Sequence, residues 1–229
     1  MRCGDCKREG RDLTGGVNLA ALALLAATLA CGGTPAENAS RRPISLAETE
    51  GRTHQAMTAE IRAEGTTPLM YVAGYGDADK VSDFLAKGED VKARDKDGWT
   101  ALHHATLGGV HDDVMRLLIR AGAEVNARTP GGETPLMFSA RKGKVEEVRT
   151  LIEAGADVNL ANKSGETALI MVSGLGHSEE EAKAVTELLL RAGADANAKD
   201  SSGKTAMRLA KESKRPPIVK LLKDAGATR

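Results

Sequence analysis

One phrase recurs along this chain at an almost constant spacing, and this repetition restricts the fold more than any other feature. "TPLMYVA" begins at Thr67, "TALHHAT" at Thr100, "TPLMFSA" at Thr134, "TALIMVS" at Thr167 and "TAMRLAK" at Thr205, so the spacings are 33, 34, 33 and 38 residues. A period near 33 residues is typical of stacked arrays, in which each copy buries its apolar face against the next copy. Because each copy touches only its neighbours, stability is roughly a sum of contributions from copies and from interfaces.

The pattern predicts two short helices in each copy. Thr-Pro or Thr-Ala opens the first helix, since a Thr side chain caps free amides and Pro is tolerated in a first turn. The second helix has apolar residues at i, i+3 and i+4, and it ends at a glycine, which favours left-handed backbone. The apolar triplets are Val81-Phe84-Leu85, Val114-Leu117-Leu118, Val148-Leu151-Ile152, Val185-Leu188-Leu189 and Ile218-Leu221-Leu222, and the glycines are Gly88, Gly122, Gly155, Gly193 and Gly226.

A second recurring phrase follows each of these glycines, in forms such as "GAEVN" and "GADVN", and it leads to a turn. Together these motifs resemble the ankyrin repeat family, whose consensus is Thr-Pro-Leu-His, then a helix with Leu-Leu, then Gly-Ala-Asp-Val-Asn. The resemblance covers residue 65 to the C-terminus and implies an all-α ankyrin-repeat solenoid of about five helix-turn-helix repeats with short β-hairpin-like turns. The family His is kept only as His103, and the other copies have Met70, Met137, Ile170 and Arg208 at this position.

The resemblance also implies a non-catalytic scaffold that holds protein partners with its hairpin tips and with the exposed face of its first helices. Trp99 is the only Trp and stands beside a turn. An exposed Trp is a frequent interface anchor, and a ring that only covers the neighbouring helix start is the alternative. The predicted protein-binding residues at the tips are Lys96, Asp97, Trp99, Glu133, Lys163, Glu166 and Lys204.

Composition excludes several other classes of function. The 229 residues include 32 basic and 32 acidic side chains, whereas nucleic-acid modules usually have a clear basic surplus. Aromatic side chains are too scarce, at 2%, for a platform that stacks single strands. All three cysteines precede the repeats, so the repeats hold no disulfide, thiolate metal site or cysteine nucleophile. We expect a monomer without cofactor or nucleic acid.

A cluster of imidazoles and carboxylates in "HHATLGGVHDD" is the one candidate for catalysis or metal binding. Such groups can hold a metal or act as an acid–base pair. However, His103 occupies the structural position of the family and His104 is its neighbour on a packed helix. His111, Asp112 and Asp113 open a second helix, where the helix dipole favours Asp. With no phosphate loop, nucleophile elbow or zinc-helix motif, we predict no catalytic residues and no metal, and an enzyme is a distant alternative.

The N-terminal segment has the features of a targeting sequence. An uncharged run, "VNLAALALLAATLA", spans residues 17–30 and is followed by Cys31, and basic residues precede it. The run is short for a transmembrane helix and fits the apolar core of a signal peptide. The cysteine resembles the lipidation site of a bacterial lipoprotein. A secretory signal cut near Ala30 and an uncleaved anchor are the alternatives. "CGDC" near the start offers only half of a zinc site.

These features predict the domain organisation and the function. Residues 1–30 form a signal peptide, 31–46 the lipidated cysteine and a flexible tether, 47–64 a capping helix and 65–229 the repeats, divided as 65–96, 97–130, 131–163, 164–201 and 202–229. We expect a lipid-anchored adaptor or inhibitor of the cell envelope, immunity-like or accessory to an enzyme, on the periplasmic face of the membrane or free in the periplasm. The rival hypothesis is a cytosolic or host-directed effector whose residues 17–30 form a membrane anchor. The fourth copy carries extra residues near "GLGHSEEEAKA", a charge run that is either a solvated face or a partner-facing loop.

Overall fold

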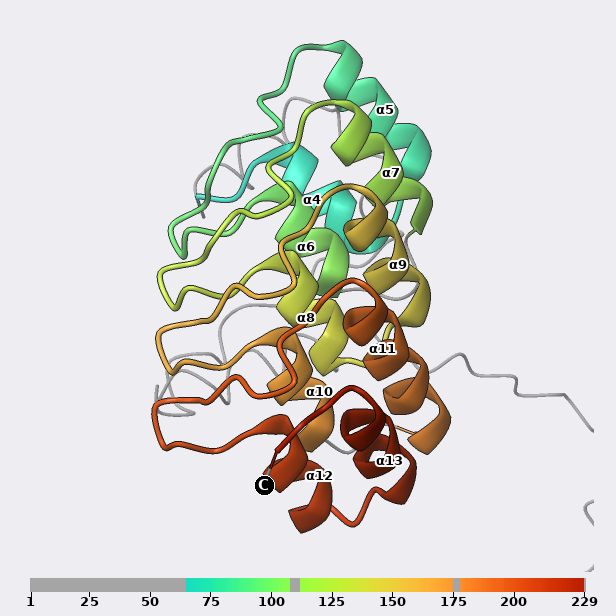
Figure 1. The fold of residues 1–229 in the computed structure, drawn as a ribbon. Coiled ribbons are helices and arrows are strands. Elements are labelled where there is room, and N and C mark those ends of the chain that lie inside the picture. The colour runs from blue at the N-terminus through green and yellow to red at the C-terminus, as the bar shows by residue number, and fades with distance from the viewer. Residues whose placement is uncertain (1–64, 108–111, 175–177, 229) are drawn as a thin grey trace, which may run out of the picture. The chain divides into compact units, whose positions relative to one another are not determined.

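The computed structural model describes residues 65–107, 112–174 and 178–228. The predictions for the leader, Cys31, the tether, the capping helix and His111 therefore lie outside the described residues. No helix within these three ranges is long and apolar enough to cross a membrane. The described residues form ten helices in two layers, and successive copies stack along one axis (Figure 1).

Each copy contributes one helix to each layer. The first helices are α4 (Pro68–Tyr75), α6 (Ala101–Leu107), α8 (Pro135–Arg141), α10 (Ala168–Gly174) and α12 (Ala206–Glu212). The second helices are α5 (Ala78–Ala86), α7 (Asp112–Arg120), α9 (Val145–Glu153), α11 (Glu179–Arg191) and α13 (Pro216–Asp224). The turns between copies project from one side of the stack (Figure 1). The predicted all-α solenoid is confirmed, and within the described ranges the turns contain only an isolated β-bridge, between Lys199 and Thr205.

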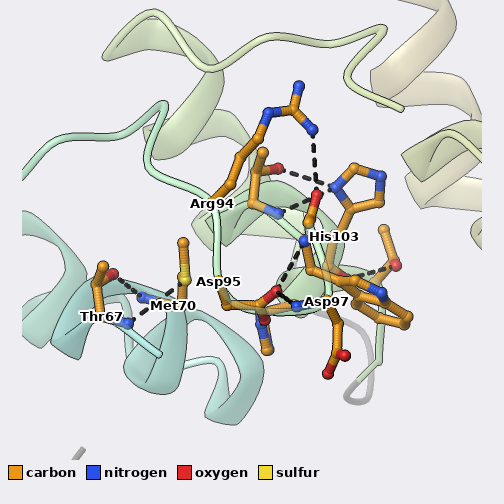
Figure 2. Close-up of polar contacts among 11 residues, drawn as sticks. Thr67, Met70, Arg94, Asp95, Asp97 and His103 are labelled. Carbon is orange, nitrogen blue, oxygen red and sulfur yellow. Dashed lines mark hydrogen bonds and ion pairs between the residues drawn. The ribbon is translucent and has the colours of Figure 1, made fainter. Parts of the chain in front are cut away.

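Threonine caps begin the first helices as predicted. The Thr67 hydroxyl accepts a hydrogen bond from the Met70 amide at 3.2 Å, and the Thr67 amide lies 3.4 Å from the Met70 sulfur (Figure 2). Thr134 and Thr205 cap α8 and α12 in the same way. Each cap satisfies an amide that the helix itself cannot bond, so the recurring Thr fixes the start of these first helices.

The apolar triplets of the second helices form part of one continuous core. Val81, Val148 and Leu151 are completely buried, and the buried cluster runs from Leu69 in the first copy to Leu222 in the last. Each helix pair packs against the pairs of the neighbouring copies. The next copy thus covers the face that a single helix pair would leave exposed to water, and burial of this face is the main source of stability.

Two glycine positions show different physical requirements. Gly155, which ends α9, has φ +86°, and a Cβ there would meet no atom within 4 Å, so only the left-handed backbone demands glycine. Gly165, in a hairpin tip, has φ +76°, and its Cβ would lie 2.8 Å from the Ser201 amide nitrogen of the next tip. At Gly165, both the backbone and the close approach of the next copy exclude a side chain.

A row of asparagines joins the copies beyond the core. Asn159 donates to the Gly193 carbonyl at 3.1 Å and accepts from the Asp195 amide at 2.8 Å. Asn126 makes the equivalent pair of bonds to Gly155 and Asp157, and Asn197 bonds residues 226 and 228. The recurring Asn is therefore a link that fixes the register of each copy on the next.

The extra residues of the fourth copy lengthen its second helix. Helix α11 has 13 residues, whereas α9 has nine. Ser178 caps it by accepting from the Glu181 amide at 3.3 Å, and the carboxylates at 179, 180 and 181 are exposed. Residues 179–181 thus form a solvent-exposed helix start, which the positive end of the helix dipole stabilises.

Candidate protein-binding surface

The turn side chains give each hairpin tip a defined shape. In the first tip, Asp95 Oδ1 accepts hydrogen bonds from the amides of Asp97 at 3.0 Å and Trp99 at 2.8 Å (Figure 2). Asn162 and Asp200 make the same two bonds in the next-to-last and last tips. An Asp or Asn that bonds its own turn holds the backbone without help from a sheet, so the tips present side chains from a rigid frame.

Backbone hydrogen bonds also join neighbouring tips to one another. The Lys163 amide donates to the Gly131 carbonyl at 2.9 Å, and the Ser201 amide donates to the Ser164 carbonyl at 2.8 Å. Between the earlier tips, the Arg94 guanidinium bonds the Gly98 carbonyl at 3.1 Å (Figure 2) and the Arg128 carbonyl at 2.8 Å. The separate turns therefore form one continuous edge, which we call the tip edge (residues 94–99, 128–133, 161–166 and 199–204).

All seven predicted binding residues lie on the tip edge, with different exposure. Lys96, Asp97 and Lys163 are exposed, and the other four side chains are half-buried. Glu133 pairs with Arg141 of α8 at 3.1 Å, and the Glu166 carboxylate accepts from the Asn162 amide group at 2.9 Å. Glu133 and Glu166 thus stabilise the frame itself, while the three exposed residues present their charged groups to solvent.

Trp99 links the second copy to the third. Its half-buried ring lies 4.8 Å, centroid to centroid, from the ring of Phe138 on α8. The Arg141 guanidinium lies over the same Phe138 ring, 4.7 Å from its centroid. The His103 and His104 rings lie within 6 Å of the same indole, at 5.9 and 5.8 Å. The indole therefore covers the neighbouring helix and also offers a partly exposed aromatic edge beside the tips.

His103 has a structural role, as its position in the repeat predicts. The ring is completely buried, and its Nδ1 accepts from the Thr100 amide at 3.2 Å. Nε2 lies 3.3 Å from the Glu133 carbonyl of the next copy, a bond in which the ring N–H donates. Burial lowers the pKa of His103 to about 4, so the imidazole is neutral near pH 7 and holds two copies together.

The other members of the predicted cluster are separated by their own partners. His104 Nε2 lies 2.8 Å from Asp95 Oδ2 in the tip. Asp112 pairs with Arg116 at 2.8 Å and accepts from the Thr150 hydroxyl of α9. Burial alone would raise the pKa of Asp112, but these hydrogen bonds outweigh it and lower the pKa. In the described ranges, no group of three His, Cys, Asp or Glu side chains is placed to hold a metal ion.

Two exposed apolar side chains at the C-terminal ends of first helices were not among the predicted residues. Tyr75 and Leu107 end neighbouring first helices α4 and α6, and 45% and 38% of their surfaces are exposed. The Tyr71 ring packs at a tilt against the Tyr75 ring, with the ring centroids 4.7 Å apart. Both residues follow the last buried position of their helix, and this position in the repeat is the signal that could have identified them.

The stacked helix pairs, the hydrogen-bonded tips and the linking asparagines define a helical repeat array. A family model described as "Ankyrin repeats (3 copies)" matches residues 45–129, 69–162, 109–181 and 136–228 in overlapping windows. These matches cover most of the chain, which therefore belongs to the ankyrin repeat family. The predicted repeat family and solenoid fold are thus confirmed.

Several characterised proteins share part of this sequence. An ankyrin repeat-containing protein of Schizosaccharomyces pombe is 38% identical over 72 residues, which is 31% of this chain and 34% of the relative. Human protein phosphatase 1 regulatory subunit 27 is 33% identical over 84 residues, 37% of this chain and 54% of the relative. Serine/threonine-protein kinase 12 of Arabidopsis thaliana is 39% identical over 72 residues, 31% of this chain and 16% of the kinase. The similarity spans about half or less of each relative, and the kinase matches through repeats alone.

Proposed function

We propose that this protein is a lipid-anchored adaptor or inhibitor that binds a protein partner along the tip edge. Ankyrin repeats imply a scaffold for protein–protein interaction, which is the general part of this function. The single observation that carries the choice of surface is the tip edge itself, because backbone hydrogen bonds and the Arg94 side chain join its tips and so hold their charged side chains on one frame. Trp99 is partly exposed on this edge, and Tyr75 and Leu107 are exposed at the C-terminal ends of first helices, so these side chains offer apolar area of the kind that interface cores need.

The second helices are poor candidates for the same role. Their apolar side chains are used in stacking against neighbouring copies, and their outer faces carry scattered charges, for example Asp83 on α5 and Arg149 on α9. A photo-crosslinker introduced at Asp97 should therefore capture the partner, whereas the same group at Asp83 should not. Equal capture at both positions would show that the tip edge is not the binding surface.

Replacing Trp99 with alanine should weaken partner binding by about 2 kcal/mol, roughly thirtyfold, because a central aromatic side chain is lost. The partner that the crosslinker at Asp97 captures is identified first, and it then serves as the ligand in a calorimetric titration. Because Trp99 also packs on Phe138, each variant is first tested for helical content by circular dichroism. Asp83→Ala is the control and should bind as the wild type does. If Trp99→Ala bound equally well, the indole would serve packing only.

Replacing Cys31 with serine should abolish lipid labelling and release the protein from membranes. The reason is chemical, since the thiol at the end of the apolar run is the only group there that a lipid can modify in the way the resemblance implies. Fractionation of cells and incorporation of labelled palmitate measure the two effects, with Cys6→Ser as the matched control. A wild-type protein that is soluble without detergent and still begins at Met1 would contradict the lipid anchor.

A further inference from the structure

A groove lies on the last described copy, along the end of α12, the turn that follows it and α13. These two helices form the last pair of the stack among the described residues (Figure 1). The groove there has a volume of about 440 Å³. Its apolar lining comes from Ala210, Pro216 and Val219. Buried Arg215 also lines it and donates to the Val172 carbonyl of α10, so this arginine belongs to the packing between copies.

Four lysines surround this apolar lining. Lys211, Lys214, Lys220 and Lys223 line the groove and are exposed, and none of them forms an ion pair with another described residue. Residues 206–224 contain six basic and two acidic side chains, although the whole chain is neutral. One of these acids, Glu212, already pairs with Arg208 at 2.8 Å. The groove therefore combines an apolar lining with a surplus of unneutralised positive charge.

Lys214 holds one of these charges in an unfavourable backbone conformation. Its φ is +53°, and it is the only described residue other than glycine with a positive φ. The equivalent turn residues of the first and third copies are Gly76 and Gly143, with φ +76° and +70°, and the second and fourth copies have Gly109 and Gly176 in the sequence. A lysine here is strained where glycine would not be. Residues held in sparsely populated backbone conformations cluster at functional sites.

We propose that this groove docks an acidic, amphipathic peptide segment of a protein partner. Apolar side chains of the peptide cover Ala210, Pro216 and Val219, and its carboxylates pair with the surrounding lysines. A partly apolar lining favours a peptide over nucleic acid, since no aromatic side chain is present in the groove to stack on a base. The groove is separate from the tip edge, so this inference does not rest on the proposed binding function.

A labelled synthetic peptide of alternating Glu and Leu is the probe, and the matched peptide of Gln and Leu is its control. Fluorescence anisotropy with the full chain should show binding of the Glu peptide and at least about tenfold weaker binding of the Gln peptide, because the lysines lose their counter-charges. The double variant Lys211→Glu/Lys223→Glu should lose more than about tenfold in affinity. The same charge reversal at Lys92 and Lys183, exposed lysines outside both the groove and the tip edge, should lose far less.

Lys214→Gly separates the docking role from the fold. Glycine relieves the strained turn, so the midpoint of thermal unfolding should rise by roughly 2–4 °C. The same variant should bind the Glu peptide about threefold more weakly, since one exposed charge pair is lost. A variant that is both stabler and weaker in binding supports the proposal. Unchanged affinity in Lys214→Gly and in the double variant would overturn it, and so would equal binding of the two peptides. Tighter binding of anionic phosphatidylglycerol vesicles than of the peptide, sensitive to the same lysines, would also overturn it in favour of a membrane surface.

Discussion

Replacing Leu151 with alanine should lower the free energy of unfolding by roughly 2–5 kcal/mol, because the truncation leaves a cavity in a packed core. Leu151 is 0% exposed and lies in the central copy, where α9 packs against both α7 and α11. One truncation therefore weakens two interfaces of the stack. Urea unfolding followed by circular dichroism measures the loss. Lys163→Ala at an exposed tip is the control and should cost less than about 0.5 kcal/mol.

Leu222→Ala tests whether a loss of stability in one copy spreads to copies that are not its neighbours. Leu222 has the same place in the last copy as Leu151 in the third, four residues before the terminal glycine, and it is equally buried. The last copy has one described neighbour instead of two, so shortening the Leu222 side chain should loosen α12 and α13 more than the helices of the other copies. Hydrogen exchange resolves the copies separately. Uniform loss of protection in all copies for Leu222→Ala would contradict contributions confined to neighbours.

Replacing Glu147 with valine should stabilise the protein by roughly 3 kcal/mol above neutral pH and hardly at all in acid. Glu147 is 1% exposed. Its Oε2 accepts from the Ser139 hydroxyl at 2.8 Å, whereas Oε1 has no partner among the described residues. Burial raises the pKa of this carboxyl from 4.5 to about 7, against the opposing effects of Ser139, Lys144 and Lys142. Copies two, four and five have Val114, Val185 and Ile218 at this position, eight residues before the glycine that ends each second helix.

The pH dependence follows from the direction of this shift. Between about pH 4.5 and 7, the folded state keeps the proton of Glu147 while the unfolded chain releases it, so this residue makes stability fall as pH rises. His103 has the opposite effect, because its folded pKa lies near 4 and the unfolded value is 6.5. Its contribution is lost as pH falls through that range. In the wild type, these two opposite effects on the pH dependence of stability largely offset each other. In a variant without Glu147, the rise of stability with pH that His103 causes should become visible.

Chemical unfolding of wild type and Glu147→Val at a series of pH values measures the difference. The variant's advantage should grow from near zero at about pH 4 to its full size at about pH 8. Glu146→Gln, at the exposed neighbouring position, should differ from wild type by less than about 0.5 kcal/mol throughout. A constant difference for Glu147→Val across this range would mean that the buried carboxyl does not titrate.

The repeat pattern predicted the fold because the same physical requirement recurs in every copy. Threonine caps, apolar triplets and terminal glycines each appear several times, so a deviation in one copy does not obscure them. The structural role of His103 followed from its place in the repeat. The roles of single-copy features were harder to predict. Glu147 follows the start of a helix, where acids are favoured, and only its alignment with Val114 and Val185 reveals that it is buried.

The candidate surface could be predicted only in outline. The positions of the tips follow from the turn residues, and all seven predicted residues lie there. Whether a side chain at a tip is exposed depends on the neighbouring copy, as the packing of Trp99 on Phe138 shows. Contacts between copies, such as this one, are set by three-dimensional packing and not by local pattern. The left-handed backbone of Lys214 is a different case, because it appears only when the last copy is aligned with the copies that have glycine at this turn position.

The row of linking asparagines has a consequence for recognition. Asn126 and Asn159 each bond the following copy in the same way, so the tips at 128–133, 161–166 and 199–204 are joined in the same register from one to the next. Equivalent positions on these tips therefore recur along the surface at the repeat interval. A partner whose own contact points match that interval can engage several tips at once without distorting either molecule, and a partner shifted by half an interval meets the gaps. Selectivity can therefore arise from distance as well as from the chemistry of the side chains at each tip.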